Sequence, residues 1–247
     1  MMMRKWELPP QSLRFMKESD EKFLSIARQN VSLLRQHGLN DTDRLLDLGC
    51  GYGRLAYGLE ESGFRGHYVG VDILPKHIQW CEANIQAKMP NYRFQHLDIQ
   101  NDRYNPKGQY AAEDAPFEFG TGSFEFVSLF SVFTHMYEAE IRNYLSNIYE
   151  VLVEGGRCLC TFFIYDEQRL PRLTNPNLKL SMIHVLNDHT RFHDADDPLY
   201  AIAFERGYLE DLVNRLGFTC VSINYGCWDG SGGNRQTYQD HAVLEKS

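Results

Sequence analysis

Short apolar segments alternate with helix-length segments along most of this chain, and that alternation limits the folds it can adopt. Five short apolar strands separated by helices form parallel βαβ units, because a parallel crossover needs a dozen or more residues and its helices cover both sheet faces. The predicted strands are Arg44–Leu48, His67–Val71, Tyr92–Leu97, Phe124–Phe130 and Arg157–Phe163.

Apolar residues at helical spacing predict the helices that connect and flank these strands. Gly38 and Gly217 follow two of them, and glycine commonly ends a helix. Glu154-Gly155-Gly156 is expected to end a third. The predicted helices cover residues 12–37, 55–62, 76–87, 138–152 and 205–216.

The last part of the chain departs from the regular rhythm. Residues 165–204 contain Asn/Pro punctuation and His/Asp clusters, which are typical of an insertion. Two more strands follow, Thr219–Asn224 and His241–Leu244. Because no helix-sized segment separates them, we expect them to be antiparallel neighbours.

Charge and apolar patterning exclude several classes of partner. The chain has 25 basic and 33 acidic residues and a net charge of -8, which disfavours nucleic acid. No apolar run approaches the roughly 20 residues that span a membrane, and the first ten residues lack the apolar stretch of a signal peptide. The six cysteines include no CxxC pair. We therefore expect a cytoplasmic protein whose partner is a small molecule; the sequence does not predict its oligomeric state.

A glycine-rich turn, Gly49-Cys50-Gly51-Tyr52-Gly53, follows the first predicted strand and its Asp47. Ligands of open α/β sheets bind at the carboxyl ends of strands, where glycines let the backbone approach them. Position 54 is Arg, where the GxGxxG pattern of dinucleotide sites has its last glycine. An acidic residue at this mouth suits a ligand that carries an ammonium group. The simpler alternative is a tight strand-to-helix connection without a ligand.

Two further carboxylates end the second and third strands. Asp72, 25 residues after Asp47, can accept hydrogen bonds from both hydroxyls of a ribose. Asp98, followed by Ile99, can receive an adenine amino group while the isoleucine packs on the ring. Asp72 could instead cap the next helix, and Asp98 could be a turn residue.

Together these residues resemble the class I S-adenosylmethionine-dependent methyltransferases, well over residues 40–164 and loosely over 205–245. The resemblance implies a Rossmann-like, doubly wound α/β fold. Its seven-stranded sheet would be mostly parallel with an antiparallel last strand, and a small lid insertion would be added. It also implies the cofactor S-adenosyl-L-methionine, bound across the first four strands. The implied cofactor-binding residues are Asp47, Gly49, Cys50 and Gly51 around the methionine part, Asp72 and Ile73 at the ribose and adenine, Asp98 and Ile99 at the adenine, and Phe130 after the fourth strand.

On this resemblance, residues 1–247 form a single methyltransferase domain. Its expected parts are a helical cap over residues 1–40, a cofactor-binding core over 41–164, a lid-like insertion over 165–204, and a C-terminal helix and strand pair over 205–247.

His135, just past the fourth strand, is the predicted catalytic base. Oxygen nucleophiles must lose a proton during methyl transfer, and the pKa range of histidine suits that task. The alternative is that His135 only packs at the start of the next helix. Phe130-Ser131-Val132-Phe133 stands where amino-directed methyltransferases have Asn/Asp-Pro-Pro-Tyr/Phe. Oxygen is therefore the preferred acceptor atom, and the nitrogen of a small amine remains open.

The insertion and the last loop hold the predicted acceptor contacts. Tyr225, Trp228, Arg235 and Tyr238 form an aromatic and basic cluster that could stack a ring, or could instead close the hairpin as an apolar patch. His189 and His193 have metal-ligand spacing if helical, but a lid or solvated loop is the favoured interpretation, so no metal is predicted.

Three short stretches resemble a bacterial subgroup of small-molecule methyltransferases that act on sugars or other secondary metabolites. They are residues 104–108, 130–136 and 238–240. Methyl transfer to a small molecule is thus the leading hypothesis. The alternatives are an NAD-dependent oxidoreductase, disfavoured by the missing third glycine and the antiparallel ending, and a non-catalytic cofactor-binding protein of the same fold.

Overall fold

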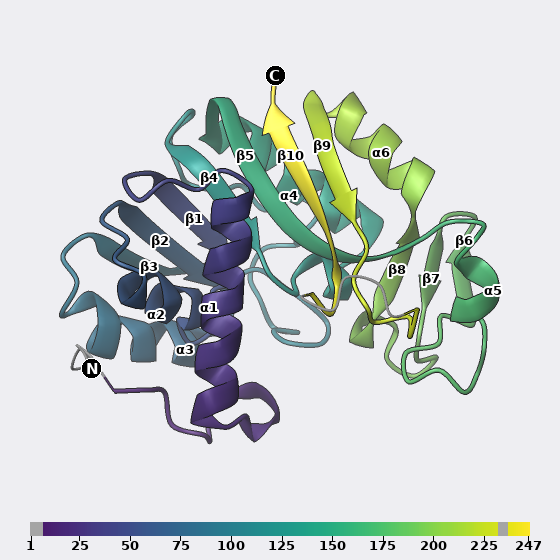
Figure 1. Ribbon diagram of the computed structural model, residues 1–247, viewed down its shortest axis with the longest axis horizontal. Helices are drawn as coiled ribbons and strands as arrows, with labels where there is room; N and C mark the ends of the chain where they lie inside the picture. The colour runs from purple at the N-terminus through teal and green to yellow at the C-terminus, as the bar shows by residue number, and fades with distance from the viewer. Residues whose placement is uncertain (1–6, 232–236) are drawn as a thin grey trace.

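The computed structural model describes residues 7–231 and 237–247, and its centre is a mostly parallel sheet (Figure 1). Seven strands follow the order β3-β2-β1-β4-β5-β10-β9. Pairing is parallel from β3 through β5, whereas β10 is antiparallel to both of its neighbours. The predicted fold is confirmed. The strands are β1 (Arg44–Leu48), β2 (His67–Asp72), β3 (Tyr92–His96), β4 (Phe124–Leu129), β5 (Leu152–Tyr165), β9 (Phe218–Asn224) and β10 (Asp240–Lys246).

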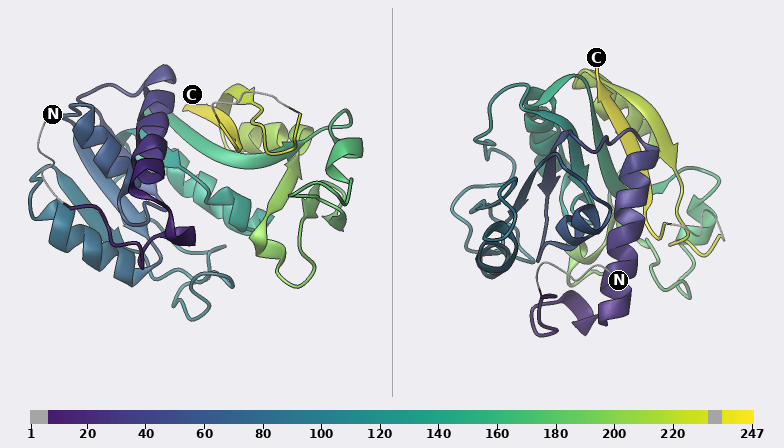
Figure 2. Two further views of the ribbon diagram at one scale, coloured as in Figure 1. Left: turned by 60° about the horizontal axis from the view of Figure 1, so that its bottom comes forward. Right: turned by 60° about the vertical axis from the view of Figure 1, so that its left-hand side comes forward.

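Helices cover both faces of this sheet, as Figures 1 and 2 show. α1, α2 and α3 pack in one apolar cluster, and α4 and α6 pack in the other. Adjacent residues of β1 point to opposite faces, so Leu45 joins the first cluster and Leu46 the second. The helices are α1 (Asp20–Gln36), α2 (Arg54–Glu61), α3 (Pro75–Cys81) with the π-helical turn η2 (Glu82–Gln86), α4 (Glu138–Val151) and α6 (Arg206–Arg215).

One predicted helix start and one predicted helix stop signal were wrong. α1 begins at Asp20 rather than at residue 12, because the Ser19 side chain caps it by accepting from the Lys22 amide at 3.3 Å. Residues before it form a turn and the 3-10 helix η1 (Phe15–Lys17). α4 ends at Val151, and β5 begins at the next residue, so the Gly155-Gly156 pair belongs to a strand whose pairing with β4 is irregular there.

The insertion adds three strands to the sheet. β5 extends to Tyr165, and β8 (Ile202–Glu205) pairs in parallel with its end. β7 (Thr190–Phe192) and β6 (His184–Asn187) continue from β8 with antiparallel pairing. These strands, α5 (Leu170–Leu173) and the 3-10 helix η4 (Pro198–Tyr200) lie on the right of Figure 1. The predicted insertion therefore extends the sheet, and its role as a lid stays a prediction.

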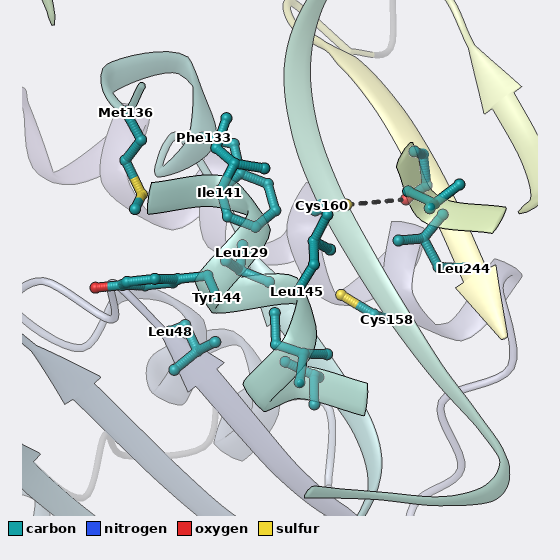
Figure 3. Close-up of a cluster of buried hydrophobic side chains, with 14 of the residues drawn as sticks. Leu48, Leu129, Phe133, Met136, Ile141, Tyr144, Leu145, Cys158, Cys160 and Leu244 are labelled. Atoms are coloured by element: carbon teal, nitrogen blue, oxygen red, sulfur yellow. Dashed lines mark hydrogen bonds between the residues drawn. The ribbon is translucent and has the colours of Figure 1, made fainter. Parts of the chain in front are cut away.

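The apolar core beneath α4 fixes the segment that follows β4. Figure 3 shows Phe133 and Met136 beside side chains of α4, β4 and β5. Phe133 is fully buried within the 3-10 helix η3 (Phe133–His135). Because buried Phe133 precedes His135 by only two residues, packing in the core fixes the position of His135 at the end of β4.

Candidate active site

The carboxyl ends of β1, β2, β3 and β4 meet at one edge of the sheet. The strand order reverses between β1 and β4, since β2 and β3 lie on one side and β5 on the other. Such a reversal opens the crevice in which open α/β sheets bind their ligands. The glycine turn after β1 and the segment after β4 flank this crevice.

Glycine is favoured at three positions of the turn, and the space around each position differs. Gly49, Gly51 and Gly53 have φ values of +77°, +55° and +81°, a region that favours glycine. A Cβ on Gly49 would lie 2.4 Å from Val132 Cγ2, and one on Gly53 2.5 Å from Ile85 Cδ1. A Cβ on Gly51 would meet nothing within 4 Å. Gly49 and Gly53 therefore permit close packing, whereas Gly51 faces open space.

Asp72 connects the glycine turn to the start of α3. Its Oδ2 accepts from the Gly51 amide at 2.7 Å, and its Oδ1 accepts from the Leu74 amide at 2.8 Å. Burial raises the pKa of this carboxyl group, while the two amides and nearby histidines oppose the shift. Each oxygen keeps a second lone pair. Asp72 thus holds the local structure and can still accept hydrogen bonds from a ligand.

Asp47 lies deeper than the sequence suggested. Its side chain is buried, and its carboxylate accepts from Tyr68 Oη at 2.8 Å and from Ser128 Oγ at 2.9 Å. Burial raises its pKa to about 7. Both oxygens therefore have protein partners between β2 and β4. Contact between this carboxylate and a ligand ammonium group stays a prediction.

The third strand end carries a half-buried carboxylate beside a core residue. Asp98 Oδ1 accepts from Asn105 Nδ2 at 3.3 Å. Ile99 is 3% exposed and belongs to the apolar core. Ile73 packs against the same core cluster, and Phe130 packs against the opposite one. These four residues lie at or just after the ends of β2, β3 and β4.

The neutral imidazole of His135 is held in one tautomer. Its Nδ1 lies 2.8 Å from the carbonyl oxygen of Leu199, so the neutral ring carries its proton on Nδ1 and its lone pair on Nε2. Burial lowers the pKa of the imidazole, and the charge of Arg103 lowers it further. The ring also meets Tyr104 edge-on at a centroid distance of 5.5 Å. A neutral imidazole with a lone pair on Nε2 can accept a proton.

A cavity of about 720 Å³ lies beside this histidine. Arg103 and Asp197 form an ion pair across it, which joins the loop after β3 to the insertion. Two lining residues, Tyr104 and Leu199, are the ones that contact the His135 ring. The lining residues are Asp102, Arg103, Tyr104, Tyr137, Asp196, Asp197, Pro198 and Leu199.

Sequence reasoning missed both the cavity and the residue that orders its loop. Asn101 is buried; its Nδ2 donates to the His135 carbonyl at 3.1 Å, and its Oδ1 accepts from the amides of Arg103 and Tyr104. The acidic and aromatic residues around positions 102–104 and 194–200 were the available signal. They are distant in sequence, so only their pairing in space joins them.

The described members of the predicted acceptor-binding cluster do not share one exposed surface. Trp228 is 3% exposed, its indole N–H donates to Asp240 at 2.7 Å, and it packs within the insertion, so its contact with an acceptor stays a prediction. Tyr225 Oη donates to Asp166 at 2.6 Å. Tyr238 is 49% exposed, and Arg235 lies outside the described residues.

The insertion histidines have structural partners of their own. His189 lies in the turn between β6 and β7, where its Nε2 is 2.8 Å from Glu138 and its ring stacks on Tyr208. His193 Nδ1 lies 2.9 Å from the Ser181 carbonyl. The segment is a hairpin, so the helical face required for metal-ligand spacing does not form. Residues 7–231 and 237–247 contain no group of three or more potential ligands arranged to hold a metal.

Comparison with known proteins identifies the family. A family model described as a methyltransferase domain matches residues 19–223. This chain belongs to the class I S-adenosylmethionine-dependent methyltransferases. A putative methyltransferase of Geobacillus sp. (strain WCH70) is 30% identical over 128 residues, covering 51% of this chain and 44% of that protein. An S-adenosyl-L-methionine-dependent Diels-Alderase of Talaromyces variabilis is 29% identical over 209 residues, covering 80% of this chain and 60% of that protein.

Solved structures share the fold at low sequence identity. A methyltransferase of Methanosarcina mazei superposes with a TM-score of 0.59 at 18% identity, covering 86% of this chain and 96% of that one. A 1,6-didemethyltoxoflavin-N1-methyltransferase of Burkholderia thailandensis, solved with S-adenosylhomocysteine, superposes with a TM-score of 0.57 at 17% identity, covering 92% and 81%. In the part of this methyltransferase that the structure describes, every helix is too short or too polar to cross a membrane.

The cofactor of this methyltransferase is S-adenosylmethionine, and the crevice fits it. Gly51 faces open space, and Asp72 offers unused lone pairs beside it. His77, in the first turn of α3, is 6% exposed, and its Nδ1 has no hydrogen-bond partner among the described residues. A buried polar atom without a partner near these groups is what a polar ligand would satisfy.

Proposed function

We propose that this methyltransferase transfers the methyl group of S-adenosylmethionine to an oxygen atom of a small molecule, a sugar or another secondary metabolite. The observation that carries the proposal is His135, a neutral imidazole whose ring contacts two residues of the 720 Å³ cavity. The Burkholderia fold neighbour is named for methylation of a small molecule, which is consistent with an acceptor of this size.

The crevice residues have assigned roles in this proposal. The backbone of the glycine turn borders the methionine part, and Asp72 accepts from the ribose hydroxyls. Half-buried and buried apolar residues flank the adenine, and Asp98 meets its amino group. The residues assigned to the cofactor are Asp47, Gly49, Cys50, Gly51, Asp72, Ile73, Asp98, Ile99 and Phe130.

The chemistry demands alignment, a dry cavity and one proton transfer. When bound, the cofactor supplies an electrophilic methyl group on a sulfonium centre. The cavity walls align the acceptor, and alignment alone is worth up to about 7–11 kcal/mol in favourable intramolecular reactions. The Arg103–Asp197 pair holds the loop after β3 against the insertion at one side of the cavity. His135 takes the acceptor proton at Nε2, because its Nδ1–H is already committed to Leu199.

Calorimetric titration of the purified protein with S-adenosylmethionine, S-adenosylhomocysteine and NAD tests the cofactor placement. We expect micromolar binding of the two adenosyl ligands, weakened at least tenfold (about 1.4 kcal/mol) by Asp72→Ala. Asp211→Ala, an exposed carboxylate on α6, is the matched control and should leave the affinity unchanged. Binding of NAD alone would refute the placement and favour the oxidoreductase.

A panel of sugars and phenols, assayed for S-adenosylhomocysteine release, tests the reaction. We expect His135→Ala to bind cofactor normally while turnover falls about 10²–10⁴-fold. Unchanged turnover would remove His135 from the mechanism. Cofactor binding without transfer to any acceptor would favour the non-catalytic alternative.

A further inference from the structure

Arg54 stands where the dinucleotide pattern has a glycine, and the structure shows what it contacts. It is the first residue of α2, and its Nη2 pairs with Glu18 and lies 2.9 Å from Tyr52 Oη. Tyr52 Oη in turn donates to Glu18 Oε1 at 2.7 Å. The Glu18 side chain is only 4% exposed. A buried carboxylate needs such partners, and removing one is far more costly than breaking a surface pair. The glycine turn is thereby tied to the segment before α1.

The segment before α1 is also held together by its own hydrogen bonds. Arg14 is 6% exposed; its Nε donates to the Pro9 carbonyl at 2.7 Å, and its Nη1 donates to the Glu18 carbonyl at 3.1 Å. Arg14 also pairs with Asp20 at 2.7 Å. Residues 9–19, which we call the N-terminal strap, are therefore folded on themselves beside the start of α1. Figure 2 shows this part of the chain running past the ends of α2 and α3.

Phe15, at the tip of the strap, lies over the crevice. Its ring contacts Tyr52 of the glycine turn at 5.9 Å, His77 of α3 at 5.3 Å and Tyr104 of the loop after β3 at 6.0 Å. Tyr104 in turn contacts His135. Yet 48% of Phe15 is exposed, so its neighbours leave much of a large apolar ring uncovered. A ligand in the crevice would bury that surface.

His77 is an independent sign of a ligand at this place. Its ring contacts both Phe15 and Tyr52, at centroid distances of 5.3 and 5.4 Å. Burial lowers the pKa of this imidazole, and the charge of Asp72 opposes the shift. Its Nδ1 is buried without a hydrogen-bond partner among the described residues. The strap, the glycine turn and α3 thus surround an unsatisfied polar atom.

We propose that the N-terminal strap is a wall of the cofactor site: Phe15 covers the bound S-adenosylmethionine, and Glu18 is a positioning residue that fixes Phe15 through Arg54 and Tyr52. This inference rests on the cofactor placement proposed above. Cofactor affinity then depends on Glu18, which does not touch the cofactor. Arg54 and Tyr52 together couple the glycine turn to the strap.

The test measures S-adenosylhomocysteine affinity and dissociation rate, with the melting temperature recorded for each variant of the full chain. We expect Phe15→Ala to weaken binding about five- to tenfold, mainly through faster dissociation, with little change in melting temperature because the ring is half-exposed. Glu18→Gln should shift the dissociation rate in the same direction. Glu61→Gln is the matched control, because Arg28–Glu61 also joins α1 to α2 but is 58% and 46% exposed.

Each possible result either supports or overturns the inference about the strap. If Phe15→Ala binds with parental affinity and dissociation rate, or binds more tightly, the ring is not a covering wall and the inference is overturned. Should Glu18→Gln fail to fold, Phe15→Ala still decides. If Asp72→Ala weakens binding and Phe15→Ala does not, only the strap inference fails. Unchanged affinity in Asp72→Ala means that the cofactor placement is wrong, and the inference falls with it.

Discussion

The buried Asp47 should make the stability of this methyltransferase fall as pH rises. Burial raises its pKa from 3.8 to about 7 in the folded protein. Between these two values the folded state binds more protons than the unfolded state, so the free energy of unfolding decreases with pH. The full shift corresponds to about 4 kcal/mol, of which about 2.5 kcal/mol is lost between pH 5 and pH 8.

Urea unfolding of the parent and of Asp47→Asn at pH 5, 6.5 and 8 measures this contribution. The difference between the two proteins isolates Asp47, because other titrating groups such as Glu140, whose pKa burial also raises to about 7, are common to both. We expect the parent to lose about 2.5 kcal/mol relative to the variant over this range.

A second variant tests the physical cause. The Ser128 hydroxyl donates to the carboxylate at 2.9 Å and opposes the upward pKa shift. Ser128→Ala should therefore raise the pKa further and steepen the loss of stability with pH. Parallel pH profiles for the parent and Asp47→Asn would refute the reasoning. They would mean that Asp47 ionises as it would in solvent, as expected for a carboxylate at the ligand mouth.

Three further predictions concern the turn, the insertion and the base. Gly49→Ala should cost about 3 kcal/mol of stability in urea unfolding, because a residue with a left-handed backbone would gain a Cβ 2.4 Å from Val132. Gly51→Ala should cost only about 1 kcal/mol of stability but weaken S-adenosylhomocysteine binding about tenfold in calorimetry. Equal effects of the two substitutions on affinity would contradict the separate roles of these glycines. Trp228→Phe should lose about 1–3 kcal/mol by removing a donor from buried Asp240 and leave the acceptor KM unchanged; a raised KM would restore its predicted contact with the acceptor. The acidic limb of the pH profile of kcat/KM should lie below pH 6.5, because burial lowers the pKa of His135 and the neutral form is the active base; a limb above 6.5 would point to another group.

Sequence reasoning located the crevice because its signals are local. The glycine turn, Asp72 and Asp98 each follow a strand, and parallel strands bring their carboxyl ends to one edge. His135 was found in the same way, as the histidine that follows β4. Its protonation pattern was not predictable, since the Leu199 carbonyl that fixes it is 64 residues away.

Long-range strand pairing gives two local patterns an environment that neighbouring residues do not predict. The local pattern around Trp228 does not predict its burial, because its partner Asp240 becomes a buried acceptor only when β10 pairs with β5. The histidines of the insertion fitted a helical face, but β7 pairs with β8 and makes the segment a hairpin. In both cases long-range strand pairing overrode a local interpretation.

The sequence by itself determined the sheet, its helices and the carboxylates that line one edge, because periodicity and turn glycines are properties of neighbouring residues. Only the tertiary structure decided which of those groups face the interior. Asp47 and Asp72 end adjacent strands in the same kind of motif, yet Asp47 is held between β2 and β4 while Asp72 caps the turn beside open space. The Glu18–Arg54 pair joins segments 36 residues apart. Burial and partners are set by the whole fold, and they determine the charge state and the reach of each side chain.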